Sequence, residues 1–127
     1  SLILGEAKIA EYLDKDYNKA IEYYSSFLEI KKAYIYATVH VDIARCYRML
    51  GKFNKAKKQL DSIYGTALKY IWDADYEYAL LYKDMGKTDA ALGKINLFLD
   101  HYKYADKDYV RVQKGIALKE DLLKLIN

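Results

Sequence analysis

One stretch of this sequence occurs twice, at positions 44–56 and again 35 residues later at 79–91. The shared positions are a small residue, a tyrosine, a glycine and a second alanine, so that Ala44, Tyr47, Gly51 and Ala56 recur as Ala79, Tyr82, Gly86 and Ala91. A weaker copy runs from Ala7 to Ala20 with one extra residue in its turn, and a partial fourth copy begins near Tyr109. Self-similarity at this period is typical of proteins built from stacked repeats. The repeat therefore constrains the fold more than any other feature.

Each copy has the pattern of two amphipathic helices joined by a short turn. Apolar residues recur at helical spacing before the glycine of the second copy, at Ile43, Tyr47 and Leu50, and again after it from Phe53 onward. A glycine between two such stretches can take the left-handed backbone conformation that ends a helix. The chain contains no proline that would break a helix. Each copy is therefore predicted to be a helical hairpin.

The pattern predicts an all-α fold, an α-α superhelix (solenoid) of antiparallel helical hairpins with about seven helices. The expected helices cover about 2–14, 17–31, 33–50, 53–67, 70–85, 88–101 and 107–126. They form hairpins over 1–31, 33–67 and 70–101 and a capping helix over 107–126. One hairpin cannot bury its apolar face alone, so we expect a single domain across 1–127. The chain opens without an initiating methionine, and we expect it to be a piece of a longer protein.

These residues resemble the tetratricopeptide repeat, which has a small residue and an aromatic in the first helix, glycine in the turn and alanine in the second. The resemblance covers nearly the whole chain and is specific in the two central copies. The chain differs from the family in its spacing of 35 to 37 residues, in having no proline at the end of a repeat, and in carrying His40 or Asp75 where tryptophan is common. The resemblance implies a concave face, formed by the first helices of successive hairpins, that binds a partner.

Composition excludes several classes of protein. The 21 basic and 18 acidic residues are interspersed, which is typical of helix surfaces and not of a nucleic-acid interface. A single cysteine cannot form an internal disulfide, and no apolar run is long enough to predict membrane insertion. The sequence favours the cytoplasm and leaves the periplasm open, since a signal or anchor would lie on a part of the protein beyond this chain.

No motif of the sequence predicts catalysis, a cofactor or a metal. The segment Gly86-Lys87-Thr88 imitates the end of a phosphate-binding loop but lacks the required earlier glycine, so it is interpreted as a turn between helices. His40 and Cys46 lie six residues apart, about 120° around a helix, and cannot act from one face. We expect Cys46 to be a small core residue and His101 to be a solvated helix end. The protein is not expected to be an enzyme.

Carboxylates on the expected third hairpin have two interpretations. Asp73 and Glu77, an i,i+4 pair, could serve as catalytic carboxylates, but a charged helix face is the simpler interpretation. On the face implied by the resemblance, acidic groups beside Tyr76 and Leu80 suit a ligand segment with a basic and an apolar residue. The expected partner-binding residues are Asp42, Arg45, Arg48, Met49, Asp73, Tyr76, Glu77, Leu80, Lys83 and Gln113, and the first hairpin adds Lys8, Glu11 and Tyr12.

We therefore expect a module that binds another protein or a peptide. One alternative is a peptide-responsive sensor domain of a bacterial signalling or transcription regulator, because the richness in Lys, Tyr, Ile and Asp is similar in style to such regions. Another is self-assembly, in which an apolar end of the array pairs with a second copy to give a homodimer. The identity of the partner cannot be derived from the sequence.

Overall fold

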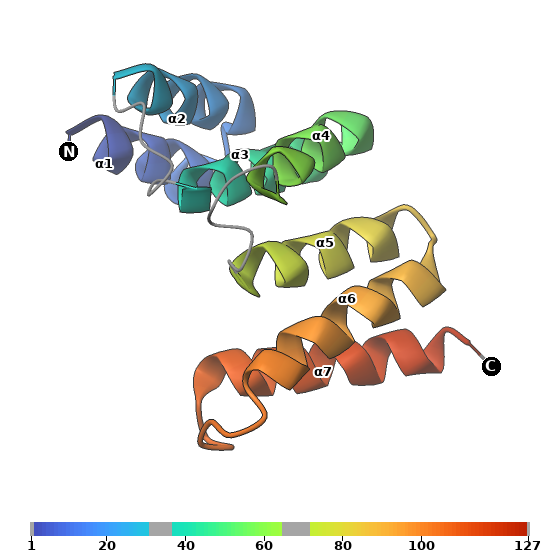
Figure 1. Ribbon diagram of the computed structural model, residues 1–127. Coiled ribbons are helices and arrows are strands. Elements are labelled where there is room, and N and C mark those ends of the chain that lie inside the picture. Colours follow the sequence, from blue (N-terminus) through green and yellow to red (C-terminus); the bar gives the residue numbers. More distant parts are fainter. Residues whose placement is uncertain (1, 31–36, 65–71, 127) are drawn as a thin grey trace. The chain divides into compact units, whose positions relative to one another are not determined.

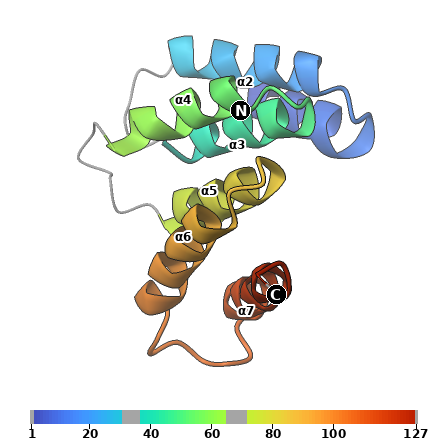
Figure 2. The same ribbon diagram turned by 90° about the vertical axis from the view of Figure 1, so that its right-hand side faces the viewer.

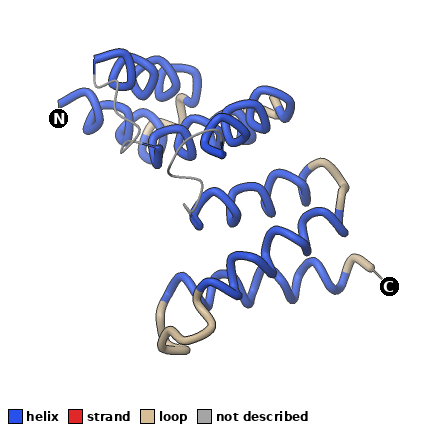
Figure 3. Tube along the Cα trace, viewed as in Figure 1, coloured by secondary structure: helices blue, strands red, loops and turns tan. Residues whose placement is uncertain are grey.

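The computed structural model describes residues 2–30, 37–64 and 72–126. These residues form helices and turns, and no strand occurs in these three segments (Figure 3). The elements in chain order are α1 (Leu2–Lys8), the π-helix η1 (Ile9–Leu13), α2 (Tyr17–Ile30), α3 (Ala37–Met49), α4 (Phe53–Tyr64), α5 (Trp72–Asp84), α6 (Thr88–His101) and α7 (Val110–Lys124). The predicted all-α class with about seven helices is confirmed.

The helix boundaries follow the sequence pattern closely, and the α6 boundaries match the predicted 88–101. Predicted helical positions 31, 33–36, 65–67 and 70–71 lie outside the described residues. The expected capping helix begins at Val110 instead of 107, because the segment 102–109 forms a loop between α6 and α7 (Figure 2). Within this loop, the backbone N–H groups of Asp108 and Tyr109 both donate to Asp106, at 2.9 and 3.0 Å, and these turns delay the start of the helix.

The chain forms two compact units, Ser1–Ile71 and Trp72–Asn127. In the first unit, α1 and η1 pack against α2, α2 against α3, and α3 against α4 (Figure 1). In the second unit, α5 packs against α6 and α6 against α7. Each unit is thus built from helices that pack on their neighbours in sequence, as helical hairpins do.

Two glycines end the first helices of the second and third hairpins. Gly51 and Gly86 have φ angles of 74° and 75°, in the left-handed region that residues with a Cβ avoid. Lys52 N–H donates to the Tyr47 carbonyl at 2.9 Å, and Lys87 N–H donates to the Tyr82 carbonyl at 2.8 Å. These bonds, each spanning five residues, are the Schellman arrangement that satisfies the last carbonyls of a helix. The predicted glycine turns are confirmed.

The first hairpin accommodates its extra residue differently from the prediction, which assigned it to the turn. Here Asp16 N–H donates to the Ala10 carbonyl at 2.8 Å, a span of six residues, and the segment before it is the π-helix η1. Lys15, with a φ of 55°, stands where the other hairpins have glycine. The additional residue therefore widens the end of the first helix, which is a known way for a helix to absorb an insertion.

Each unit has its own apolar core. In the first, Tyr24 and Phe27 of α2 pack with small residues of α1 and η1 and with Val39, Ile43 and Cys46 of α3. Burial of one large side chain of this kind contributes about 1.5–3 kcal/mol relative to exposure. Cys46 is fully buried, so its predicted place in the core is confirmed.

The core of the second unit lies between α5, α6 and α7. It contains Ala79, Ala91, Ile95, Phe98, Leu118 and Leu122. The two alanines are fully buried, in agreement with their expected role of letting helices approach closely. Gly115 of α7 serves the same purpose, because a Cβ at this position would lie 2.8 Å from Leu99 Cδ2 and 2.9 Å from Phe98 Cε2.

Candidate functional site

A buried carboxylate lies at the centre of the first unit. Glu11 of η1 is 3% exposed, and its carboxylate accepts a hydrogen bond from the Tyr24 hydroxyl of α2 at 2.8 Å. Arg45 of α3 donates to both oxygens of the same carboxylate, from Nη2 to Oε1 at 2.8 Å and from Nε to Oε2. A fork of this kind holds both partners in fixed orientations. Three elements of the unit therefore converge on Glu11.

The extra residue of the first copy explains how a glutamate reaches this position. Counted forward from Ala7 at the spacing of the other copies, Glu11 would correspond to Arg48 and Lys83. Counted back from Tyr17 of the second helix, it corresponds to Tyr47 and Tyr82. The π-helix makes this change of register, because it inserts one residue without ending the helix. Glu11 consequently takes the place that half-buried tyrosines occupy in the other two hairpins.

Arg45 is held by a second carboxylate. Its Nη2 also donates to Asp42 Oδ1 at 2.7 Å, and the two side chains are 23% and 20% exposed. Burial alone would lower the pKa of the Arg45 guanidinium, but the hydrogen bond to Glu11 and the charges of Asp42 and Glu11 outweigh it and raise that pKa. Burial raises the pKa of Asp42, and the charge and hydrogen bond of Arg45 oppose the rise. Arg45 is thus a fixed cation between two carboxylates.

Exposed apolar groups lie beside this ionic cluster. The Tyr12 ring lies over the Arg45 guanidinium, 5.4 Å from its centroid to Cζ, and Tyr12 is 52% exposed. Met49, one turn after Arg45 on α3, is 51% exposed. Tyr12 of η1 and Asp42, Arg45 and Met49 of α3 together form a patch, named the η1–α3 surface. Its sequence-predicted members are brought together by the fold, and neighbouring Arg48 is half-buried.

Several residues of the second unit that were predicted to bind a partner contact the core of the unit more than expected. Glu77 is 4% exposed, so it does not have the open position expected for a groove carboxylate. The Tyr76 ring packs on Phe98 with centroids 5.3 Å apart, and Leu80 packs on the same core. Tyr76 is therefore a packing residue and not the exposed anchor that the sequence predicted, because helix periodicity alone did not reveal its contact with α6.

Charged and polar side chains at the edge of the second unit remain accessible. Asp73 accepts a hydrogen bond from Arg111 Nη1 at 2.6 Å, with side chains 37% and 48% exposed, so this ion pair is largely solvated. Lys83 of α5 is half-buried and Gln113 of α7 is exposed. Sequence analysis missed Arg111 as the partner of Asp73, because the two lie 38 residues apart with no pattern that links them.

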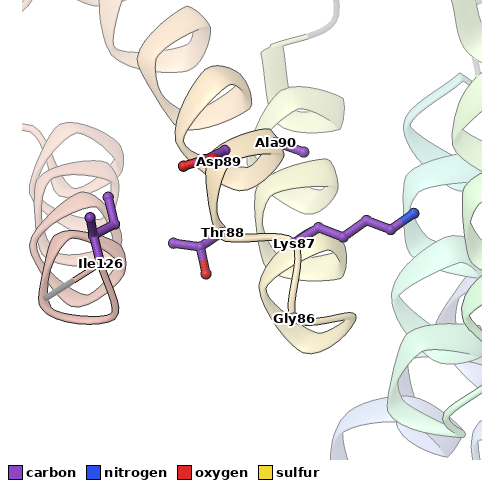
Figure 4. Close-up of a pocket in the computed structure, with 6 residues that line it drawn as sticks. All are labelled: Gly86, Lys87, Thr88, Asp89, Ala90 and Ile126. Atoms are coloured by element: carbon purple, nitrogen blue, oxygen red, sulfur yellow. The ribbon is translucent and has the colours of Figure 1, made fainter.

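A cavity of about 560 Å³ lies at the turn between α5 and α6 (Figure 4). It is lined by Gly86, Lys87, Thr88, Asp89, Ala90 and Ile126. Thr88 and Asp89 lie on the side of the turn that faces Ile126, whereas the Lys87 side chain extends away from it. The polar side chains therefore do not converge on one point, and the segment that imitates a phosphate loop is the turn that joins two helices.

His40 and Cys46 take part in packing, whereas His101 is exposed at the end of α6, as predicted. Gln59 Nε2 lies 2.7 Å from His40 Nδ1 and donates to it, and burial lowers the pKa of His40, which favours the neutral ring. His101 stacks on Trp72 with ring centroids 4.0 Å apart. Burial raises the pKa of the Cys46 thiol to about 12, which makes it a poor nucleophile. Among the described residues, no group of His, Cys, Asp and Glu side chains is arranged to hold a metal ion.

None of the helices described by the structure has the length and hydropathy needed to cross a membrane. No protein-family model and no curated protein sequence matches the chain. The tetratricopeptide character therefore stays a resemblance carried by the repeated residues, and the η1–α3 surface is the candidate site of the first unit.

Proposed function

We propose that this chain is a protein- or peptide-binding module and that its partner docks on the η1–α3 surface. The observation that carries the proposal is Tyr12, a half-exposed aromatic ring held over an arginine that is itself fixed by Glu11 and Asp42. Aromatic side chains on rigid supports lose little entropy on binding and are common anchors of interfaces. Met49 adds a flexible apolar group that adapts to the shape of a partner.

The neighbouring exposed residues support the same proposal. Ile9 and Leu13, at the two ends of η1, are 50% and 75% exposed, so the first helix presents several apolar side chains to solvent. Exposed apolar groups that lie together on a folded protein often mark interaction sites. The resemblance to tetratricopeptide repeats adds support, because in that family the first helices of successive hairpins bind partners. A sensor domain would use this same surface and differ only in the output domain attached to it.

A capture experiment tests the proposal. The purified chain is immobilised, exposed to a lysate of its source, and compared with a Tyr12→Ala, Met49→Ala double variant. Tyr104→Ala is the matched control, because Tyr104 is 91% exposed but lies in the loop of the other unit. We expect a protein that the wild type and the control retain and the double variant loses. Retention by all three would place the binding surface elsewhere.

Self-association is a second candidate, favoured by exposed apolar residues at the C-terminal end. Ile116 and Leu123, seven residues apart on α7, are 43% and 46% exposed, and Leu125 and Ile126 after the helix are 58% and 52% exposed. Their spacing puts Ile116 and Leu123 on one stripe of the helix. Light scattering over a range of concentrations tests this candidate, since a dimer through α7 would dissociate on Leu123→Lys and not on Tyr104→Ala.

A further inference from the structure

The guanidinium of Arg45 is an obvious place for a partner's carboxylate, but carboxylates of the chain already hold it. Nε and Nη2 are used by Glu11, and Nη2 is also used by Asp42. An incoming carboxylate would be limited to Nη1, beside two carboxylates of the chain that repel it, or would have to displace one of them. A displaced Glu11 would be a buried charge without its cation, which is strongly unfavourable. The surface therefore does not favour acidic groups at Arg45.

Asp42 has hydrogen-bonding capacity left for a basic partner. Its Oδ1 accepts from Arg45, whereas Oδ2 accepts no hydrogen bond from the described residues, and the side chain is 20% exposed. Two carboxylates and one guanidinium leave the cluster with one net negative charge. The exposed Lys8 also acts on Asp42 and partly offsets that charge. A cationic group of a partner can therefore pair with Asp42. The pairing is stronger when the Lys8 ammonium, which repels a second cation, lies farther from Asp42.

Tyr12 and Met49 define what should lie next to that cation. The Tyr12 ring is half-exposed, and its face can receive an apolar side chain or the stem of an arginine. The thioether of Met49 offers a second apolar contact. An acceptor and two apolar groups are thus presented within one surface.

We infer that Glu11 is a built-in carboxylate that occupies Nε and Nη2 of Arg45 and so disfavours acidic ligands there, and that the η1–α3 surface takes a partner segment carrying a basic side chain beside an apolar one. The inference rests on the proposed function and specifies the chemistry of its partner. The basic side chain pairs with Asp42, and the apolar side chain packs on Tyr12 and Met49. Glu11 sets the charge preference without touching the partner, so it is a positioning residue.

Two synthetic peptides test the charge preference. They share the same leucine and tyrosine positions, and one carries lysine where the other carries glutamate. Fluorescence anisotropy measures the affinity of each peptide at one fixed salt concentration, since exposed charges are screened by salt. The wild type should bind the lysine peptide about tenfold more tightly than the glutamate peptide.

Three variants identify the groups that set the preference. Glu11→Gln removes the negative charge that holds Nε and Nη2 of Arg45, so it should strengthen binding of the glutamate peptide and weaken binding of the lysine peptide, each by about tenfold. Asp42→Asn should weaken binding of the lysine peptide and is a safeguard if Glu11→Gln fails to fold, because Asp42 is partly exposed. Lys8→Gln should strengthen binding of the lysine peptide by about threefold. Circular dichroism confirms that each variant is helical.

Results that differ from these expected ones overturn the inference. The inference is wrong if the wild type prefers the glutamate peptide, or if folded Glu11→Gln and Asp42→Asn keep the ratio of the wild type. Failure of the wild type to bind either peptide also overturns it. The proposed function would survive that last result if the Tyr12→Ala, Met49→Ala variant still lost a protein that the wild type retains from lysate.

Discussion

Arg45 of α3 and Glu11 of η1 form a two-point hydrogen-bonded ion pair, in which Nε and Nη2 of the guanidinium reach the two oxygens of one carboxylate. The residues are 34 positions apart in the chain. Their pairing ties the first helix of the first hairpin to the first helix of the second. It also fixes the cation over which Tyr12 lies, so the stability of the unit and the form of its candidate binding surface depend on the same contact.

Replacement of Glu11 by alanine should be strongly destabilising. It leaves the largely buried Arg45 without its two-point partner, and breaking one side of a buried ion pair typically costs about 3–5 kcal/mol. Urea denaturation followed by circular dichroism measures the free energy of unfolding. Glu6→Ala is the control, because Glu6 is exposed on α1 and its loss should change that free energy by less than about 0.5 kcal/mol. Equal effects of the two substitutions would show that the pair is not buried in solution.

Lys15 should be replaceable by glycine with a gain in stability. Its φ of 55° is in the left-handed region, where a residue with a Cβ is strained by about 1–2 kcal/mol. Part of that gain is lost to the greater freedom of glycine in the unfolded chain, so Lys15→Gly should stabilise by about 0.5–1 kcal/mol. Thermal unfolding followed by circular dichroism measures the change.

Gly51→Ala is the opposite substitution and provides the control. A Cβ at Gly51 would meet no atom within 4 Å, so its effect reports the backbone conformation alone. It should destabilise by about 1 kcal/mol, because φ is 74°. A loss of stability in Lys15→Gly would contradict the left-handed conformation assigned to Lys15.

The sequence was sufficient to predict the helical hairpins, because glycine turns and apolar spacing are local signals. Gly51, Gly86 and the boundaries of α6 all follow from them. The sequence shows that the first copy has one extra residue, but the repeat pattern does not indicate whether the turn or the helix accommodates it. Both solutions keep the second helix in register, and only tertiary packing decides between them.

The burial of the charged residues was less predictable than the positions of the helices. Glutamate is usually a surface residue, yet Glu11 and Glu77 are only 3% and 4% exposed. The partners that make burial of Glu11 tolerable, Arg45 and Tyr24, lie 34 and 13 residues away and leave no mark on its local pattern. Counted from Ala7, Glu11 aligns with the charged residues Arg48 and Lys83, and it aligns with tyrosines only after the change of register made by η1.

His40 should make the first unit less stable in mild acid. Burial lowers its pKa below 6.5, so the unfolded chain takes up a proton at a pH where the folded chain does not. The free energy of unfolding should therefore fall as pH decreases from about 7 through 6.5 toward about 5. Protonation would also remove the lone pair of Nδ1 that accepts the bond from Gln59.

His40→Gln separates this effect from the titration of the carboxylates. Asp42, whose pKa is raised, acts in the opposite direction over acidic pH, since its protonation favours the folded state. Denaturant unfolding of both proteins at several pH values gives the difference that belongs to His40. The variant should lose less stability on acidification than the wild type, and parallel curves would contradict the assigned environment of the ring.

Gly115 and Gly93 both lie in helices of the second unit. Replacement by alanine should change the stability of the unit in opposite directions at the two positions. A Cβ at Gly115 would lie 2.8 Å from Leu99 Cδ2 and 2.9 Å from Phe98 Cε2, so either these packed side chains or α7 itself must shift. Overpacking of this kind typically costs about 1–3 kcal/mol, so Gly115→Ala should destabilise the unit. A Cβ at Gly93 would meet nothing within 4 Å in the middle of α6, where alanine is favoured over glycine by about 0.5–1 kcal/mol. Thermal unfolding should therefore shift down for Gly115→Ala and up for Gly93→Ala, and an upward shift for both would mean that α7 does not pack closely on Phe98.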